Sequence, residues 1–130
     1  MGAQRQPRVV QPPRTFEGTA WKWMRYSGIL LIPLAWIHVL IKDVLVGVHQ
    51  IDLTYVQRTW AFTLWRIYDF LLLAFALSHG MNGLRQVLMD YIHSPSGRSR
   101  LNWILFIIWL IVLLMGAVAI LGGVKGAEAF

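Results

Sequence analysis

The sequence predicts an all-α membrane protein with three transmembrane helices. Of its 130 residues, 57% are hydrophobic and only 14% are charged, whereas about a quarter of the residues of an ordinary soluble domain are charged. Three apolar segments, at about residues 24–48, 64–88 and 101–123, are each long enough for a helix to cross a bilayer. The 7 tryptophans and 4 tyrosines suit the aromatic belts of a membrane protein.

The length allows one domain, and short tails are expected at its two ends. Residues 1–19 contain three arginines, three prolines and no apolar run, which predicts a mostly extended cytoplasmic tail and no signal peptide. Residues 20–124 form the predicted three-helix membrane region, and residues 125–130 a short C-terminal tail. The chain has no cysteine, which excludes disulfides, thiol catalysis and iron–sulfur ligation within it.

The first apolar segment is interrupted only by His38 and the pair Lys42-Asp43. Pro33 lies inside this segment, and a proline there removes a backbone donor and is expected to kink the helix. The connection that follows, residues 50–63, is predicted to be a surface turn or a short interfacial helix.

The second apolar segment carries Asp69 near its start and His79 inside it. We expect Asp69 to lie near the outer interface and to pair with a nearby base such as Arg66. Ser94-Pro95-Ser96-Gly97 predicts a turn before the third segment, which has no charged residue after Arg100.

The basic residues flanking the segments predict the orientation of the chain. Eight lie on the side of the N-terminus, and four lie on the other side, which also carries the C-terminus. The eight are Arg5, Arg8, Arg14, Lys22, Arg25, Arg85, Arg98 and Arg100, and the four are Lys42, Arg58, Arg66 and Lys125. We therefore expect an integral protein of a bacterial cytoplasmic membrane with its N-terminus and Tyr91 on the cytoplasmic side.

A polar stripe runs along the second predicted helix. Gln86 and Asp90, at +7 and +11 from His79, return to nearly the same helical face, flanked by Asn82 and Gly83. A polar group at membrane depth is costly, and an ionisable residue there is a functional-site hypothesis by default.

Two glycines, Gly80 and Gly83, remove side chains next to His79. They predict either close packing of another helix backbone or a flat ligand, such as a porphyrin coordinated by the histidine Nε2. A hydrogen bond across a helix interface is the simpler role for a membrane histidine.

The first segment carries a second histidine, His38, with Ser27 on roughly the same face eleven residues earlier. Helical rise puts His38 about 20 Å from Arg25 and His79 about 18 Å from Tyr91. Since Arg25 and Tyr91 are both expected on the cytoplasmic side, the two histidines are predicted to lie at comparable depth. The remaining histidines, at positions 49 and 93, are expected to be solvated.

Three runs in this sequence resemble the membrane-anchor D subunit of succinate dehydrogenase (succinate:quinone oxidoreductase, respiratory complex II). The resemblance covers roughly residues 19 to 124. The H-x(10)-D-Y spacing is its most specific part. The runs are His79-Gly80 with Asn82-Gly83-Leu84-Arg85 and Asp90-Tyr91, then Tyr68-Asp69-Phe70-Leu71-Leu72-Leu73, then Trp23-Met24-Arg25-Tyr26-Ser27-Gly28.

In that family, two anchor subunits of three helices each hold b-type haem between them and dock a flavoprotein and an iron–sulfur protein. The resemblance implies that His79 is an axial haem ligand and that the C subunit supplies the opposite one. It implies that Tyr91 hydrogen-bonds a quinone, with Asp90 supporting that site. Arg25 and Ser27 look like contacts of a haem propionate or of the quinone.

The resemblance leaves the number of haems open. Anchors of the one-haem kind lack a ligand in the first helix, whereas those of the two-haem kind use a histidine there. His38 is therefore a candidate ligand of a second haem. Alternatively, His38 and His79 approach one haem together. The resemblance also leaves open whether the quinone is ubiquinone or menaquinone, and whether the complex oxidises succinate or reduces fumarate.

Two other classes of protein fit the sequence. One is a cytochrome b anchor of another quinone-linked oxidoreductase, such as a formate dehydrogenase or hydrogenase, although those usually have a fourth span and more histidines. The other is a haem-free structural subunit. In each case the chain has no flavin fingerprint and no soluble domain, so it would take part only at the quinone end and carry no succinate chemistry.

Overall fold

A computed structural model describes residues 15–123, and the predictions made for residues 1–14 and 124–130 lie outside that range. The described chain is built from helices joined by short connections. They are α1 (Phe16–Val39), continued by the π-helical segment η1 (Leu40–Gly47) and the 3₁₀ turn η2 (Val48–Gln50), then α2 (Leu53–Trp60), α3 (Thr63–Tyr91) and α4 (Pro95–Gly122).

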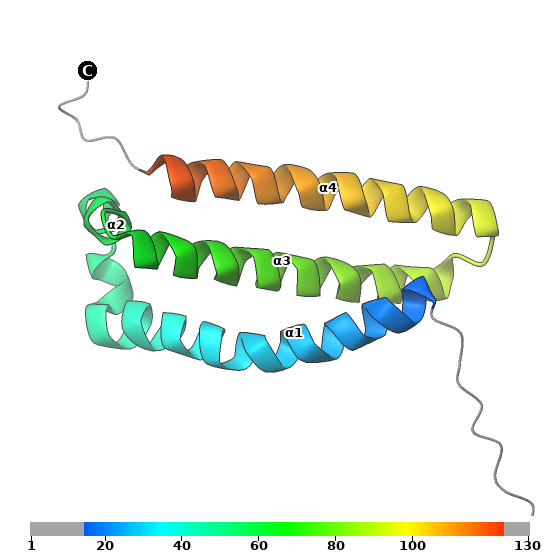
Figure 1. Cartoon of the computed structure of the whole chain (residues 1–130), viewed down its shortest axis with the longest axis horizontal. Coiled ribbons are helices and arrows are strands. Elements are labelled where there is room, and N and C mark those ends of the chain that lie inside the picture. The colour runs from blue at the N-terminus through cyan, green and yellow to red at the C-terminus, as the bar shows by residue number, and fades with distance from the viewer. Residues whose placement is uncertain (1–14, 124–130) are drawn as a thin grey trace, which may run out of the picture.

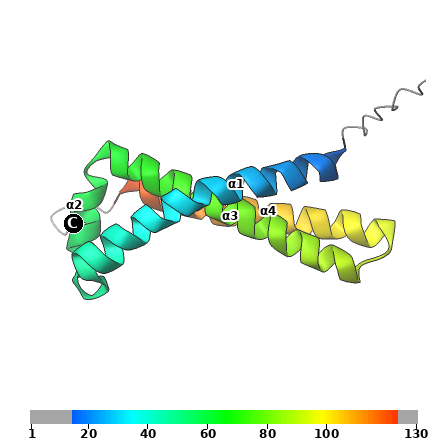
Figure 2. The same cartoon turned by 90° about the horizontal axis from the view of Figure 1, so that it is seen from below.

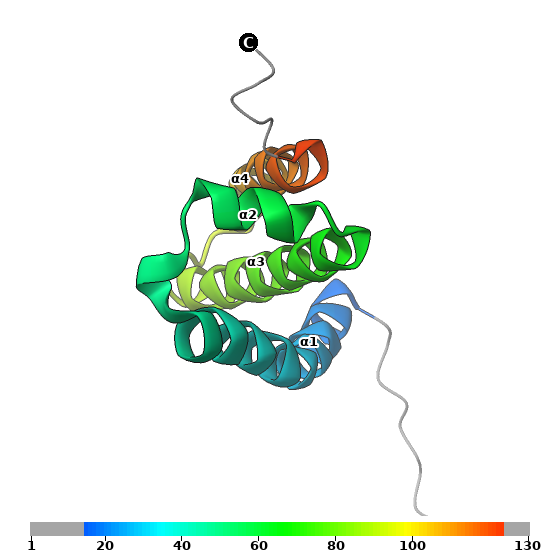
Figure 3. The ribbon, with the colours of Figure 1, turned by 90° about the vertical axis from the view of Figure 1, so that its left-hand side faces the viewer.

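The three long helices lie side by side with α3 in the middle (Figure 1). α3 packs against both α1 and α4, whereas α1 and α4 scarcely touch each other. Seen from below, α1 and α3 cross each other at an angle (Figure 2). The short helix α2 lies across one end of this layer (Figure 3).

The layer has little interior. Among the described residues, only Leu105 and Ile120 are buried hydrophobic side chains, and large apolar side chains are exposed along α1, α3 and α4. Apolar faces of this extent are stable only when lipid or another protein covers them.

Two described helices are long and apolar enough to cross a membrane. They are Phe16–Gln50, with a mean hydropathy of 2.1, and α4, with a mean hydropathy of 3.2. A third span is obtained if α2 and α3, bent by 106° to each other, are taken together. α3 is less apolar because it carries the candidate polar residues, among them Asp69, His79 and Arg85.

α1 begins earlier than the apolar segment that predicted it. Thr15 is extended and its side chain accepts a hydrogen bond from the Gly18 N–H at 3.1 Å, which satisfies a free donor of the first turn. Glu17 in that turn is favourable near the positive end of the helix dipole. The tail boundary predicted at residue 19 therefore falls inside α1, because this N-cap signal was overlooked.

Pro33 does not interrupt α1. The helix is continuous through it and curves along its length (Figure 1). The change of helical geometry comes later, at Leu40, where the π-helical segment begins.

Both connections differ in detail from a simple turn. Of the two alternatives for residues 50–63, the short helix is correct: Asp52 caps α2 by accepting from the Tyr55 N–H at 2.7 Å. The turn predicted from Ser94 to Gly97 is the start of α4 instead. Ser94 caps the helix by accepting from the Gly97 N–H at 3.2 Å, and Pro95 occupies the first helical position, which suits its fixed φ.

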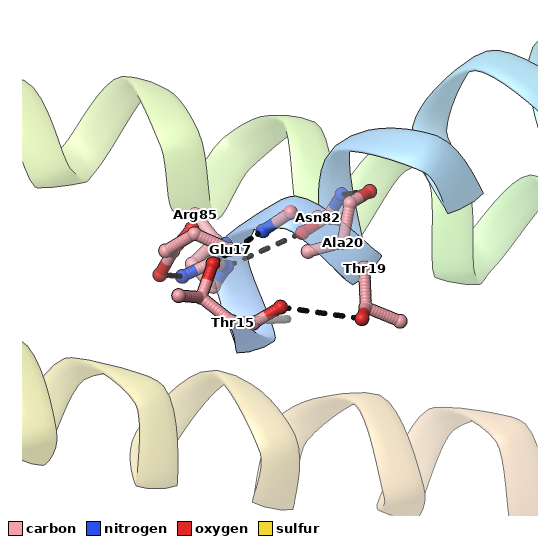
Figure 4. A network of polar contacts seen from close by, with 7 residues as sticks. Thr15, Glu17, Thr19, Ala20, Asn82 and Arg85 are labelled. Carbon is pink, nitrogen blue, oxygen red and sulfur yellow. Dashed lines mark hydrogen bonds and ion pairs between the residues drawn. The ribbon is translucent and has the colours of Figure 1, made fainter. Parts of the chain in front are cut away.

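The beginning of α1 is tied to the far end of α3 (Figure 4). Arg85 donates two parallel hydrogen bonds to the carboxylate of Glu17, at 2.8 and 2.7 Å, and a third to Asn82 Oδ1 at 3.2 Å. Asn82 in turn donates to the Ala20 carbonyl at 3.2 Å. Arg85 is 6% exposed although it is charged, so it needs this pairing.

α4 packs on the other side of α3. The Trp109 indole donates to the Ser78 hydroxyl at 3.0 Å. Gly116 lies so close to Leu73 that a Cβ there would overlap the leucine side chain. Small residues that let helices approach closely are typical of packing inside membranes.

We expect Glu17→Gln and Arg85→Met each to lower the thermal midpoint of the purified membrane complex. The double variant should fall no further than Arg85→Met, because both changes remove the same bond. The coupling free energy between Glu17 and Arg85 in this double-mutant cycle should be about 1 kcal/mol, because the Glu17 side chain is 67% exposed and solvent screens the pair. Asp43→Asn, which changes an exposed carboxylate in the segment η1 that continues α1, is the matched control. Additive effects of the two single changes would contradict the expectation.

Candidate functional site

His79 points from α3 at α1. Its Nδ1 lies 3.0 Å from the hydroxyl oxygen of Ser27, and a Cβ built on Gly28 would lie 3.2 Å from its Cε1. Ser27 is 1% exposed and His79 is half-buried. Across residues 15–123, the other ring nitrogen, Nε2, has no hydrogen-bond partner.

The two glycines beside His79 have different surroundings. A Cβ on Gly83 would lie 3.0 Å from Met24 Cε, so this glycine lets α1 approach. Gly80 has nothing within 4 Å of that position and faces open space. Gly83 therefore has the helix-packing role predicted for the pair, whereas the flat ligand predicted beside Gly80 stays a prediction.

Gly80 begins an exposed stripe on α3. Leu84, Val87 and Tyr91 follow it at +4, +7 and +11, which places all four on one helical face. Their exposed fractions are 46% for Leu84, 56% for Val87 and 78% for Tyr91. An open apolar stripe therefore runs from beside His79 to the end of the helix.

Asp90 and Tyr91 are the last two residues of α3, and their side chains lie on different faces of the helix. Adjacent helical residues point about 100° apart, and Asp90, which is exposed, lines a polar cleft of about 460 Å³ together with Arg85 and Arg98. The Tyr91 hydroxyl has no partner within residues 15–123. This chain alone does not bring the two side chains together.

Arg25 and Ser27, predicted to share one role, have different surroundings. Arg25 is exposed and its guanidinium lies over the Trp21 ring at 4.8 Å, so it is open to an anionic group. Ser27 is buried and bonded to His79. Its hydroxyl is therefore covered within this chain, and its contact with a propionate or a quinone stays a prediction.

His38 lies at a second polar cluster, with Asp69 and Trp60. Its Nδ1 is 3.7 Å from Asp69 Oδ1, and neither of these buried atoms has a hydrogen bond. Asp69 Oδ2 accepts from the Trp60 indole at 2.8 Å. The predicted pairing of Asp69 with Arg66 is wrong, because α2 turns back over α3 and places Trp60 on Asp69, while Arg66 donates to the Trp60 carbonyl.

The two histidines lie at different depths, contrary to the prediction. His79 is level with Ser27, and His38 lies eleven residues further along α1, about 16 Å by helical rise. The depths differ because α1 begins at Phe16, so that Arg25 lies well inside the helix and not at its cytoplasmic end. This separation prevents both histidines from reaching one iron atom.

A cavity of about 650 Å³ lies between α1, α3 and α4 and was not anticipated. Five aromatic side chains and a few polar ones line it, and the Oδ1 atom of Asn102 on its wall is buried without a hydrogen bond. The aromatic residues are Phe16, Trp23, Trp103, Phe106 and Trp109. The sequence offers a signal only in the polar residues of this lining, among them Ser78 and Asn102.

Within residues 15–123, no group of three or more His, Cys, Asp or Glu side chains could hold a bare metal ion. A haem needs less from the protein, because the porphyrin supplies four ligands and the chain one or two. His79 can supply one axial ligand, and a second would have to come from another chain.

The fold and the site define a helical membrane subunit with a half-buried histidine beside an open face. Residues 5–118 match the family described as the succinate dehydrogenase/fumarate reductase transmembrane subunit. The match covers most of the chain, which therefore belongs to this family. No curated protein matches the chain in a sequence comparison.

Proposed function

We propose that the chain is the D-type anchor of a succinate dehydrogenase, which binds haem b through His79 and contributes Tyr91 to a quinone site. Membership of the family establishes a transmembrane subunit of a succinate dehydrogenase or fumarate reductase complex. The choice of the D type follows from the resemblance of the run His79 to Tyr91 to that subunit. The family match favours this assignment over the anchor of a formate dehydrogenase or hydrogenase.

The observation that carries the haem proposal is the environment of His79. Its Nδ1 is engaged by Ser27, its Nε2 has no partner within the described chain, and Gly80 beside it faces open space. A ligating histidine typically uses its second ring nitrogen to hydrogen-bond a neighbouring group. The exposed apolar stripe from Gly80 to Tyr91 would form one wall for a flat apolar ligand, and the second anchor subunit would form the other.

Haem, when bound, supplies a reversible one-electron carrier to the membrane region. His79 would hold its iron, together with a histidine proposed to come from the second anchor. The exposed guanidinium of Arg25 is a candidate partner for a propionate. The apolar stripe keeps water away from the ligand.

The quinone would bind at the Tyr91 end of α3, where the catalytic subunits are proposed to dock. The Tyr91 phenol donates to a quinone carbonyl and orients it. Asp90, on the neighbouring polar cleft, provides a route for protons from water. Arg85 is already held by Glu17 and acts on the position of α3 instead.

The proposed topology has three spans, with the N-terminus and the Tyr91 end on the cytoplasmic side. α1 with η1, α3 and α4 would cross the membrane, and α2 would lie along the outer surface. The C subunit would cover the open face of the layer, and the flavoprotein and iron–sulfur subunits would dock at its cytoplasmic edge.

We expect His79→Ala to remove a b-type band from the reduced-minus-oxidised absorbance spectrum of the purified complex. The reason is that alanine provides no axial ligand. His93→Ala, an exposed histidine two residues past α3, should leave the band unchanged. A wild-type complex without any b-type band would overturn the haem proposal in favour of a haem-free structural subunit.

Tyr91→Phe should lower quinone reductase activity by about tenfold or more while leaving haem content near that of the wild type. Phenylalanine cannot donate the hydrogen bond to the reacting carbonyl, and this bond stabilises the transition state by about 1.5 to 3 kcal/mol. Tyr55→Phe, which removes a phenol at the other end of the molecule, is the control. If haem disappears with the Tyr91 hydroxyl, the residue has a structural role.

His38 is proposed as a ligand of a second haem, with the Asp69 carboxylate 3.7 Å from its Nδ1. On this proposal, His38→Ala should lower the haem count of the purified complex by one, whereas His49→Ala, an exposed histidine nearby, should not. The count is obtained from the pyridine haemochrome spectrum per mole of complex. An unchanged count in an intact complex would assign His38 to helix packing.

A further inference from the structure

Ser27 is the most deeply buried side chain of the described chain, at 1% exposure. It lies on α1 against α3, and its hydroxyl oxygen is 3.3 Å from the Met24 carbonyl and 3.0 Å from His79 Nδ1. A buried hydroxyl with two polar neighbours must use its donor and its acceptor capacity in a defined way.

The Ser27 hydroxyl has a single proton for two polar neighbours, and the role of His79 Nδ1 as donor or acceptor depends on its tautomer. One arrangement satisfies both contacts: the hydroxyl donates to the Met24 carbonyl, which can only accept, and the Ser27 oxygen accepts from His79 Nδ1–H. In this arrangement the lone pair of the neutral imidazole lies on Nε2.

Gly28 leaves room for the same ring on α1. A Cβ at this position would lie 3.2 Å from His79 Cε1, a distance at which the ring would have to move. The space left at Gly28 and the hydroxyl of Ser27 together determine where the His79 imidazole packs against α1.

We propose that Ser27 is a positioning residue for the haem ligand His79. This inference rests on the proposed function. Ser27 holds the imidazole in the tautomer that exposes the Nε2 lone pair, and it does so from within the same chain. The ligand is thus oriented before the second anchor subunit and the haem complete the site.

The hydrogen bond also makes the ligand more electron-rich, because a partner on Nδ1–H raises the basicity of the ring. An electron-rich axial ligand stabilises ferric over ferrous haem. The Ser27 bond is therefore expected to lower the midpoint potential of the haem.

The test uses Ser27→Ala and Ser27→Cys in the purified complex. Haem content, the midpoint potential and the electron paramagnetic resonance spectrum of the ferric haem are measured. Ser27→Ala should shift the potential upward and change the g-values, and Ser27→Cys should lie between it and the wild type, since a thiol is a weaker acceptor. Ser78→Ala, which removes a hydroxyl bonded to Trp109 next to His79 in the sequence, should leave potential and g-values unchanged.

Wild-type potential and g-values in Ser27→Ala with full haem content would overturn the inference. So would loss of haem from both Ser27 variants in an intact complex, which would assign Ser27 to helix packing. If Ser27→Ala loses haem and Ser27→Cys retains it, an upward shift in the cysteine variant supports the inference and an unshifted potential overturns it. Absence of haem from the wild-type complex, by contrast, would overturn the proposed function itself.

Discussion

The register of α1 against α3 is the constraint on which the rest of the structure depends. α3 carries polar groups along its length, and α1 supplies partners for several of them: Glu17 for Arg85, the Ala20 carbonyl for Asn82, and Ser27 for His79. Further along, the Leu34 carbonyl accepts from Tyr68. In an apolar environment an unpaired polar group costs several kcal/mol. A slip of one helical turn would leave most of these groups unpaired, so the polar residues determine the alignment that the apolar surfaces alone would leave free.

The sequence predicts features that belong to a single helix better than features that depend on the register between α1 and α3. The three apolar segments predicted the long helices, because the length needed to cross a bilayer is a strong signal. The sequence singles out His79 because a polar group in an apolar helix is costly, and its role as a ligand stays a prediction. Its partner Ser27 was identified as a site residue but its contact with His79 was not predicted, since contacts between helices depend on register, which a single sequence does not display.

Other differences arose from local signals that were overlooked. Ser94-Pro95 was interpreted as a turn, although a serine cap followed by proline also begins helices, as it does at α4. Thr15 similarly begins α1 before the apolar run. The pairing of Asp69 could not be predicted because it depends on the direction in which α2 leaves the membrane region. The cavity at Asn102 required the relative positions of three helices.

The depth difference between the two histidines has an energetic consequence. Their separation of about 16 Å along the helix axes is roughly half of the hydrocarbon thickness of about 30 Å. An electron that moved from the level of one histidine to the level of the other would cross about half of the membrane potential. One elementary charge that crosses the whole membrane exchanges about 2.3 kcal/mol per 100 mV with the field. At a potential of about 100 mV, this step would therefore exchange about 1 kcal/mol. A carrier at His38 would thus make the direction and rate of electron flow sensitive to the energised state of the membrane.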